Sequence, residues 1–241
     1  LTYVWRFAEL ASILSEDELH LAEECFGVSR AGNWEGVSIL TRPDGRDSRA
    51  TEVDAVLAKL HEERQKRPQP DLDDKIVVSW NALAARGLMD AGEATGDESL
   101  TERGVRLTRL LLDRAIGDDG GAVRILGDAP SSDVRLLEDA VGLCVAALQA
   151  AGITSDNGLL EEAKRLFDYA REHFYDGDGT WYMTPEDTEL PVRPREQHDS
   201  PLPSGPSLAA LAAVRLAVAT GDSGYRDMAE ATLRRAATLA E

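Results

Sequence analysis

Residues 136–151 read Leu-Leu-Glu-Asp-Ala-Val-Gly-Leu-Cys-Val-Ala-Ala-Leu-Gln-Ala-Ala, an acidic pair at the start of a segment that is otherwise almost entirely apolar or small. A helix that is apolar on all sides has to be buried on all sides. The next segment, residues 157–175, has apolar side chains on one face only, at Leu160, Ala163, Phe167, Ala170 and Phe174. Together they predict an antiparallel helical hairpin with one buried helix and one solvent-facing helix.

The same pairing occurs on both sides of this hairpin. Residues 79–94 and 204–219 are nearly all apolar or small, and each precedes an amphipathic segment such as 98–116. The string Ala-Thr-Gly-Asp ends the apolar helix at 94–97 and again at 219–222, which indicates an internal repeat. Three such hairpins predict an all-α fold, an α/α toroid or part of one. Its inner layer consists of the apolar helices and its outer layer of the amphipathic helices. Short β-hairpin insertions are expected around the strand-like stretches 122–126 and 180–183.

The first part of the chain, residues 1–70, is expected to be an irregular helical lead-in to the three hairpins of residues 71–241. Ser15 and Glu18 have the spacing of a capping box at the start of a helix. Helical spacing of apolar residues returns over 51–67, where two prolines then end the segment.

The composition excludes several classes of function. The 241 residues contain 44 Asp and Glu against 26 Lys and Arg, a formal charge of −18, and so acidic a surface repels the phosphate backbone of nucleic acids. No uninterrupted apolar run approaches the roughly 18 residues of a membrane span, so no membrane partner is expected. Two distant cysteines give no disulfide framework and favour a reducing cytoplasm.

The choice of basic residue adds an expectation about the solvent. Only four of the 26 basic residues are Lys, and the other 22 are Arg. A GC-rich genome would explain the arginines, but it would not explain the net charge. An acidic, Lys-poor surface is typical of a salt-accumulating, halophile-like cytoplasm, where screening removes the self-repulsion of the carboxylates.

Residues 73–83, Asp-Asp-Lys-Ile-Val-Val-Ser-Trp-Asn-Ala-Leu, resemble the D-D-K-x-L-x-S-W-N-G-L motif of one family. Its members include the bacterial YyaL-type proteins and the spermatogenesis-associated thioredoxin-domain proteins. Further landmarks follow in the family's order, namely Tyr3-Val4-Trp5, Gly32-Asn33-Trp34-Glu35-Gly36, Leu137-Glu138-Asp139, Gly179-Thr180-Trp181-Tyr182, and Asp199 with Pro203-Ser204-Gly205. The resemblance covers essentially the whole chain.

The resemblance implies an (α/α)6 barrel of the six-hairpin glycosidase-like class, which follows an N-terminal thioredoxin-like domain in full-length members. Residues 1–241 are therefore expected to be one partial toroid region of a longer protein, since three hairpins are fewer than six. Ala82, Ala140 and Pro206 stand where the family has Gly, Tyr and Asn, which weakens the case for an intact family site.

The inner helices of a toroid begin at one rim of a central cavity, so motifs at their first turns are expected to face a common pocket. An aromatic side chain beside carboxylates suits a carbohydrate-like ligand. The sugar ring stacks on the aromatic plane, while the hydroxyl groups of the sugar bind the carboxylates. The residues expected to bind the ligand are Asp73, Asp74, Trp80, Asn81 and Ser204, joined by Trp34 and Glu35.

Two carboxylates across a cavity could also act as acid and base. The candidates for catalysis are Glu138, Asp139, Asp199 and the adjacent His198. A structural interpretation competes with this one, because acids in the first turn of a helix complement its dipole and its free N–H groups. The residues therefore leave open whether the domain is an enzyme.

Three functions remain open. The first is a carbohydrate-binding or carbohydrate-processing toroid, by analogy of fold. The second is a non-catalytic scaffold or regulatory module that partners a thioredoxin-like domain, and the third is a redox-linked enzyme in which that domain does the chemistry. No cofactor is expected, and no metal, because the loop after Asp176 begins like a calcium loop but has Trp181 where glycine is needed.

The charge generates the first prediction. We expect the melting temperature to rise from about 0.1 M to multimolar KCl, because screening of the like charges favours the compact state. Thermal unfolding followed by circular dichroism measures it, and an uncharged osmolyte separates screening from general exclusion. A melting temperature that is unchanged or lower in KCl would remove the halophile interpretation.

Overall fold

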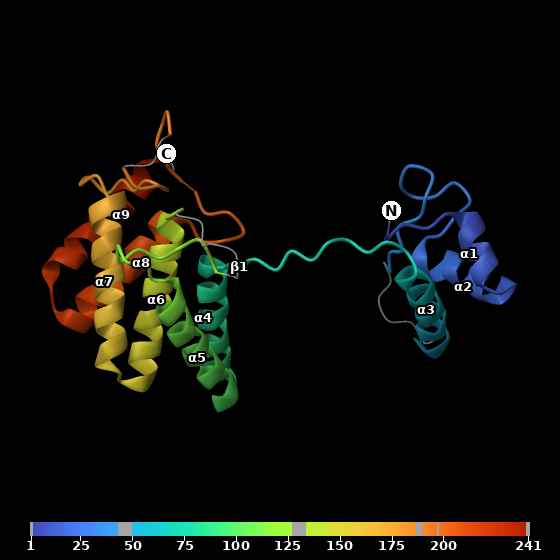
Figure 1. Cartoon of the computed structure of the whole chain (residues 1–241), viewed down its shortest axis with the longest axis horizontal. Coiled ribbons are helices and arrows are strands. Elements are labelled where there is room, and N and C mark those ends of the chain that lie inside the picture. The colour runs from blue at the N-terminus through green and yellow to red at the C-terminus, as the bar shows by residue number, and fades with distance from the viewer. Residues whose placement is uncertain (1, 43–49, 127–133, 187–189, 197, 240–241) are drawn as a thin grey trace. The chain divides into compact units, whose positions relative to one another are not determined.

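The computed structural model describes residues 2–42, 50–126, 134–186, 190–196 and 198–239 (Figure 1). The chain divides into two compact units, Leu1–Asp73 and Asp74–Glu241.

The first unit packs short helices around a small apolar core. Its helices are α1 (Phe7–Ile13), α2 (Glu16–Phe26) and α3 (Ala50–Gln65). The predicted capping box is present, since the Ser15 hydroxyl accepts the Glu18 N–H at 3.3 Å and the Glu18 carboxylate accepts the Ser15 N–H at 3.0 Å. Trp5 lies in the core beneath the Arg67 guanidinium, which is 3.9 Å from the ring centroid.

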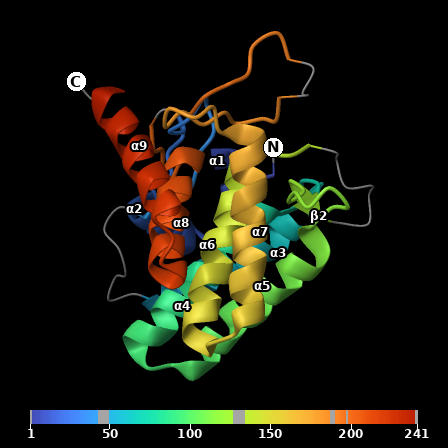
Figure 2. The same ribbon diagram turned by 90° about the vertical axis from the view of Figure 1, so that its left-hand side faces the viewer.

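The second unit consists of three antiparallel helical hairpins (Figures 1 and 2). They are α4 (Val78–Thr95) with α5 (Glu98–Ala115), α6 (Leu137–Thr154) with α7 (Asn157–Phe174), and α8 (Gly205–Thr220) with α9 (Ser223–Leu239). Along the inner layer α4 packs on α6 and α6 packs on α8. The all-α, two-layer fold predicted from the alternation of apolar and striped segments is therefore confirmed.

Helix α6 is the centre of this unit. It buries twelve of its eighteen residues, whereas its outer partner α7 buries six. By length and composition alone α6 could cross a membrane, contrary to the expectation from uninterrupted runs, but most of the helix is buried within the protein. Its contacts with α4, α7 and α8 account for its composition.

Both strand-like insertions are short local hairpins, as expected, since isolated antiparallel bridges join Ile116 to Ala122 and Tyr175 to Trp181. The first insertion also pairs with a distant segment. Residues Ile76–Val77 form β1, which runs antiparallel to β2 (Ile125–Leu126), with Ile76 opposite Leu126. Pairing across the whole first hairpin is possible because α4 and α5 are equally long and return the chain to the end at which α4 begins.

The three hairpin turns share one design. Each inner helix ends on a Thr whose hydroxyl donates to the carbonyl four residues back, passes through a left-handed residue, and reaches an Asp that accepts the N–H two residues later. The turns are Thr95-Gly96-Asp97, Thr154-Ser155-Asp156 and Thr220-Gly221-Asp222. The predicted repeat thus extends to the central hairpin, where Ser155 adopts φ 54° in place of glycine.

The turns generate the second prediction. Replacing Ser155→Gly should stabilise the protein by up to about 1 kcal/mol, because a side chain is strained in the left-handed region. The reverse change Gly96→Ser, at φ 73° with open space around its Cβ position, should destabilise it by a similar amount. Denaturant unfolding of both variants measures the pair. If the two substitutions changed the free energy of unfolding in the same direction, this account of the turns would be wrong.

Candidate functional site

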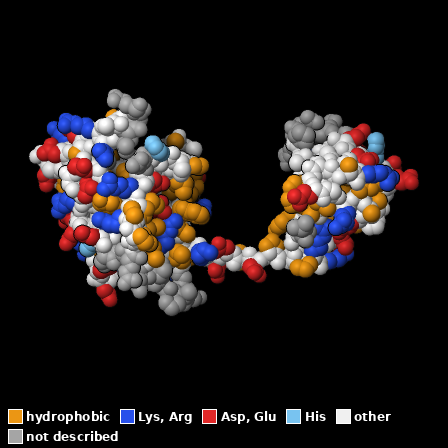
Figure 3. All heavy atoms as spheres, turned by 90° about the horizontal axis from the view of Figure 1, so that it is seen from above, with side chains coloured by type: hydrophobic (Ala, Val, Ile, Leu, Met, Phe, Trp, Pro, Cys, Tyr) orange, Lys and Arg blue, Asp and Glu red, His pale blue; other side chains and the backbone are white. Residues whose placement is uncertain are grey.

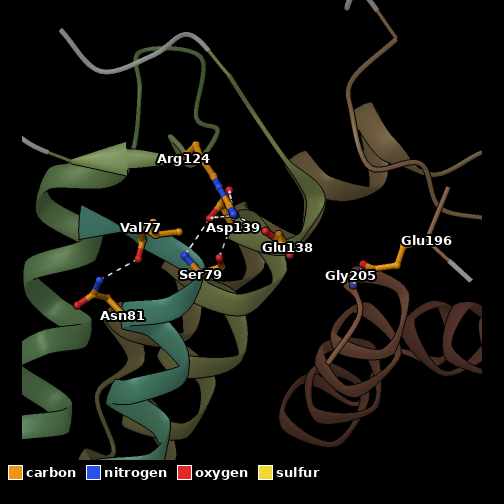
Figure 4. A network of polar contacts seen from close by, with 8 residues as sticks. All are labelled: Val77, Ser79, Asn81, Arg124, Glu138, Asp139, Glu196 and Gly205. Carbon is orange, nitrogen blue, oxygen red and sulfur yellow. Dashed lines mark hydrogen bonds and ion pairs between the residues drawn. The ribbon is translucent and has the colours of Figure 1, made fainter. Parts of the chain in front are cut away.

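One buried carboxylate ties the start of α6 to the start of α4. Asp139 is 0% exposed, and its Oδ1 accepts the backbone N–H of Ser79 at 2.8 Å (Figure 4). This N–H belongs to the first turn of α4, whose donors have no partner inside the helix. The residue before α4, Val77, has no side chain that can cap it, so the neighbouring helix supplies the acceptor.

Arg124, which directly precedes β2, lies over both acids of α6. Its Nη1 donates to Asp139 Oδ1 at 3.2 Å, to the Ser79 hydroxyl at 3.1 Å, and to the Glu138 carboxylate (Figure 4). The pairing of β1 with β2 brings Arg124 to this place. Arg124 is absent from the predicted site, and its signal in the sequence is a single cation within the short apolar stretch 122–126.

The surroundings of Asp139 change its acidity. Burial raises its pKa to about 6, against the opposing effects of the Arg124 guanidinium and the Ser79 N–H. Above this pH the buried carboxylate is ionised and depends on Arg124 for a counter-charge.

A shallow pocket opens beside this cluster, between α4, α6 and α8. It is lined by Ser79, Trp80, Leu83, Arg86, Glu138, Gly142, Leu202, Pro203 and Leu208. Trp80, Leu83 and Arg86 follow at intervals of three residues, so one face of α4 forms a wall. Trp80 is 58% exposed, whereas Glu138 is half-buried. We call this space the rim pocket.

Glu138 also lines a smaller hollow, which it shares with Glu196. The Glu196 carboxylate accepts the N–H of Gly205 at 3.2 Å and so completes the first turn of α8 (Figure 4). Two carboxylates at the starts of two inner helices therefore face one hollow. Glu196 is a further residue that the motifs do not single out, because it lies in a loop of mixed charge with no regular spacing.

The other predicted residues of the second unit mainly complete helix starts. Ser204 accepts the Ser207 N–H at 3.3 Å, and the Asn81 amide donates to the Val77 carbonyl at 2.8 Å. Asp199 accepts the Ser204 N–H at 2.9 Å, and its hydrogen bonds to this N–H and to the serine hydroxyls lower its pKa.

Two further predicted residues of the second unit are not among those that line the rim pocket. His198 is exposed, as is Asp74, which belongs to the segment before β1. Trp34, Glu35 and Asp73 belong to the first unit. There Glu35 and Gly36 have positive φ between the bridged residues Trp34 and Val37, which is the geometry of a tight hairpin turn. Within the described ranges, no three His, Cys, Asp or Glu side chains gather closely enough to hold a metal ion.

Comparison with known sequences supports the family resemblance. The chain is 26% identical to spermatogenesis-associated protein 20 of Rattus norvegicus and 27% identical to that of Homo sapiens, in each case over 93% of this chain. It spans about a third of the length of these relatives, 34% in both. No protein-family profile matches the chain.

Comparison with solved structures supports the fold. A glycoside hydrolase family 76 α-mannanase of Bacteroides thetaiotaomicron superposes with a TM-score of 0.56 at 18% identity, covering 78% of this chain and 55% of that one. A D-mannose isomerase superposes with a TM-score of 0.56 at 17% identity, covering 67% and 40%. At these identities the likeness concerns the α/α toroid architecture alone.

The buried carboxylate generates the third prediction. The pKa of Asp139 in the folded protein is about 6, above the ordinary 3.8, so folding favours the neutral acid. This contribution to the free energy of unfolding is fully present below about pH 4 and is lost as the pH rises through 6. Removing the counter-charge in Arg124→Gln should therefore cost little at pH 5 and about 3 kcal/mol at pH 8.

Urea unfolding at the two pH values measures this difference. Arg234→Gln, which removes an exposed ion pair with Glu230, is the matched control and should cost under about 1 kcal/mol at both. A loss in Arg124→Gln that is the same at pH 5 and pH 8 would contradict the proposed ionisation of Asp139.

Proposed function

We propose that the second unit binds a carbohydrate-like ligand in the rim pocket, with Trp80 as the stacking surface and Glu138 as an acceptor for ligand hydroxyls. The observation that carries this proposal is the 58% exposed indole on the wall of a pocket whose opposite side holds a half-buried carboxylate. An aromatic face beside a carboxylate offers both an apolar surface and strong acceptors to a ring that carries hydroxyl groups.

The comparisons support the ligand class by analogy of fold. The similar structures include α-mannanases and a D-mannose isomerase, which are proteins of carbohydrate chemistry. An inactive variant of the Salegentibacter α-1,6-mannanase carries replacements of two consecutive aspartates. This chain has consecutive acids, Glu138 and Asp139, at the start of an inner helix.

The contacts of these two acids favour binding over proton transfer. Asp139 is fully buried and engaged by Ser79 and Arg124, so its oxygens are directed at the protein. Glu138 shares Arg124 but also lines the rim pocket, so an oxygen of this side chain is available to a ligand. If the domain turns over a glycoside, Glu138 and Glu196 are the two carboxylates that face one hollow.

A second function, a non-catalytic scaffold or regulatory module that partners a thioredoxin-like domain, is favoured by one observation. Arg124 pairs with both acids of α6, which gives them a structural role that needs no ligand. A binding experiment separates the two functions, because only the first requires the exposed indole.

The fourth prediction is that mannose and short α-mannosides bind, and that Trp80→Ala weakens their binding about fivefold to thirtyfold, equivalent to about 1–2 kcal/mol. Titration calorimetry and ligand-observed NMR measure the affinity. Leu233→Ala, which removes a 56% exposed side chain from the outer helix α9, is the control and should leave binding unchanged.

A second pair of variants tests the pocket itself. An added methyl at Gly142 would lie 3.8 Å from Ser79 Cα, so Gly142→Ala should fold and still bind, whereas the longer side chain in Gly142→Met should fill the pocket and block binding. If no saccharide binds the intact protein, or if binding survives both Trp80→Ala and Gly142→Met, the scaffold function takes its place.

A further inference from the structure

The rim pocket holds a cation that makes no ion pair with the residues that the structure describes. Arg86 is half-buried on the same face of α4 as Trp80 and lines the pocket below it. Its Nε is buried and has no hydrogen-bond partner in the part of the chain that the structure describes. Buried polar groups of proteins are nearly always paired, so an unpaired guanidinium nitrogen calls for an explanation.

The charged groups around Arg86 do not neutralise it. Burial and, to a smaller extent, the like charge of Arg215 lower the pKa of Arg86, while Asp90 acts in the opposite direction. The Asp90 carboxylate accepts the amide of Gln149 at 2.6 Å instead of forming an ion pair with Arg86. Glu138, on the other side of the pocket, is engaged by Arg124.

A second arginine, Arg215, lies on the inner helix α8. It is the sole ionisable residue of α8, and it lines an open groove of about 1240 Å³ near the other ends of the inner helices. Gln149 lines this groove too. The oxygen of its side-chain amide, Oε1, is buried without a partner among the described residues. The inner face thus holds two cations on otherwise apolar stretches of helix.

Three other half-buried arginines of this unit have partners in the protein, although Nη1 of Arg135 is, like Nε of Arg86, buried without one among the described residues. Arg124 pairs with Glu138 and Asp139, Arg135 pairs with Asp119, and Arg193 donates to two backbone carbonyls. Basic and acidic side chains are also mixed over the surface (Figure 3), in a chain with 18 more acidic than basic residues. Acids are therefore abundant, yet the inner face leaves Arg86 without one.

We propose that the ligand of the rim pocket is a carbohydrate that carries an anionic group, a phosphate or a carboxylate, and that Arg86 binds this group. The inference rests on the proposed function and specifies its substrate class. Arg86 follows Trp80 by six residues, about 9 Å along the helix at about 1.5 Å per residue. A sugar ring on the indole would thus place a substituent at the guanidinium, with Leu83 between them.

Arginine suits this task because its planar guanidinium matches a phosphate or carboxylate with two parallel hydrogen bonds. The positive charge of Arg215 adds attraction at longer range. In the unliganded protein the same guanidinium lowers the free energy of unfolding, because a half-buried charge has lost part of its hydration without gaining a partner.

The fifth prediction compares four probes by titration calorimetry: mannose, mannose 6-phosphate, glucuronate and inorganic phosphate. The charged sugars should bind at least about tenfold more tightly than mannose, the effect of one charge-assisted hydrogen bond. Arg86→Met should abolish this advantage and leave the affinity for mannose unchanged, while Arg86→Lys should retain part of it. Comparing the phosphate with the carboxylate identifies the preferred anion.

Two controls accompany the variants. Arg106→Met makes the same change of charge at an exposed site on α5, 68% exposed, and should leave every affinity unchanged. Without ligand, Arg86→Met should melt at the same or a higher temperature than the parent protein, because it removes an unpaired charge. A large destabilisation would show that Arg86 has a structural partner, and it would overturn the inference.

The binding outcomes separate this inference from the proposed function. Equal affinities for mannose and the charged sugars overturn the anionic ligand and leave the carbohydrate pocket in place. If no sugar binds, the proposed function fails, and binding of inorganic phosphate that is lost in Arg86→Met would still support the anion site. Phosphate binding that Arg86→Met leaves unchanged would overturn it.

Discussion

The rim of the second unit depends on the carboxylate of Asp139, buried between two helices. It completes the first turn of α4 from the start of α6, so the two helices can begin side by side without a capping residue before α4. A buried carboxylate needs a counter-charge, and Arg124 supplies one from the segment before β2. Trp80 is next to Ser79 in the chain and Glu138 is next to Asp139. The contact between Ser79 and Asp139 therefore brings Trp80 and Glu138 to the same pocket.

The hairpins could be predicted because their signal is local. Apolar spacing shows which helix is enclosed and which faces solvent, and Gly96 and Gly221 mark two of the turns. The third turn has Ser155 in the same conformation, so its likeness to the others lies in the backbone and not in the residue type. The partner of residues 125–126 could not be predicted, because it follows from the return of the chain after two helices of equal length.

The site was predictable only in part, for a related reason. Trp80 and Glu138 belong to recognisable motifs at helix starts, but Ser204 and Asp199 occupy similar positions and satisfy backbone N–H groups. Spacing alone cannot separate a capping residue from a ligand-binding one, because both favour the first turn. Arg86 could have been noticed as a cation in an apolar helix, whereas the roles of Arg124 and Glu196 depend on contacts between distant segments.

The pairing of β1 with β2 also bears on how the second unit folds. Arrays of helical hairpins can form one unit at a time, because each unit contacts mainly its neighbours. Here Ile76 must meet Leu126 across the whole first hairpin, and Ser79 must meet Asp139 in the next. The strand pair closes the first hairpin at the cost of ordering a long loop, and the hydrogen bond from Ser79 forms only when the start of the second hairpin is also present. The hydrogen bond from Ser79 to Asp139 therefore couples the folding of the first hairpin to that of the second, at the helix starts that line the rim pocket.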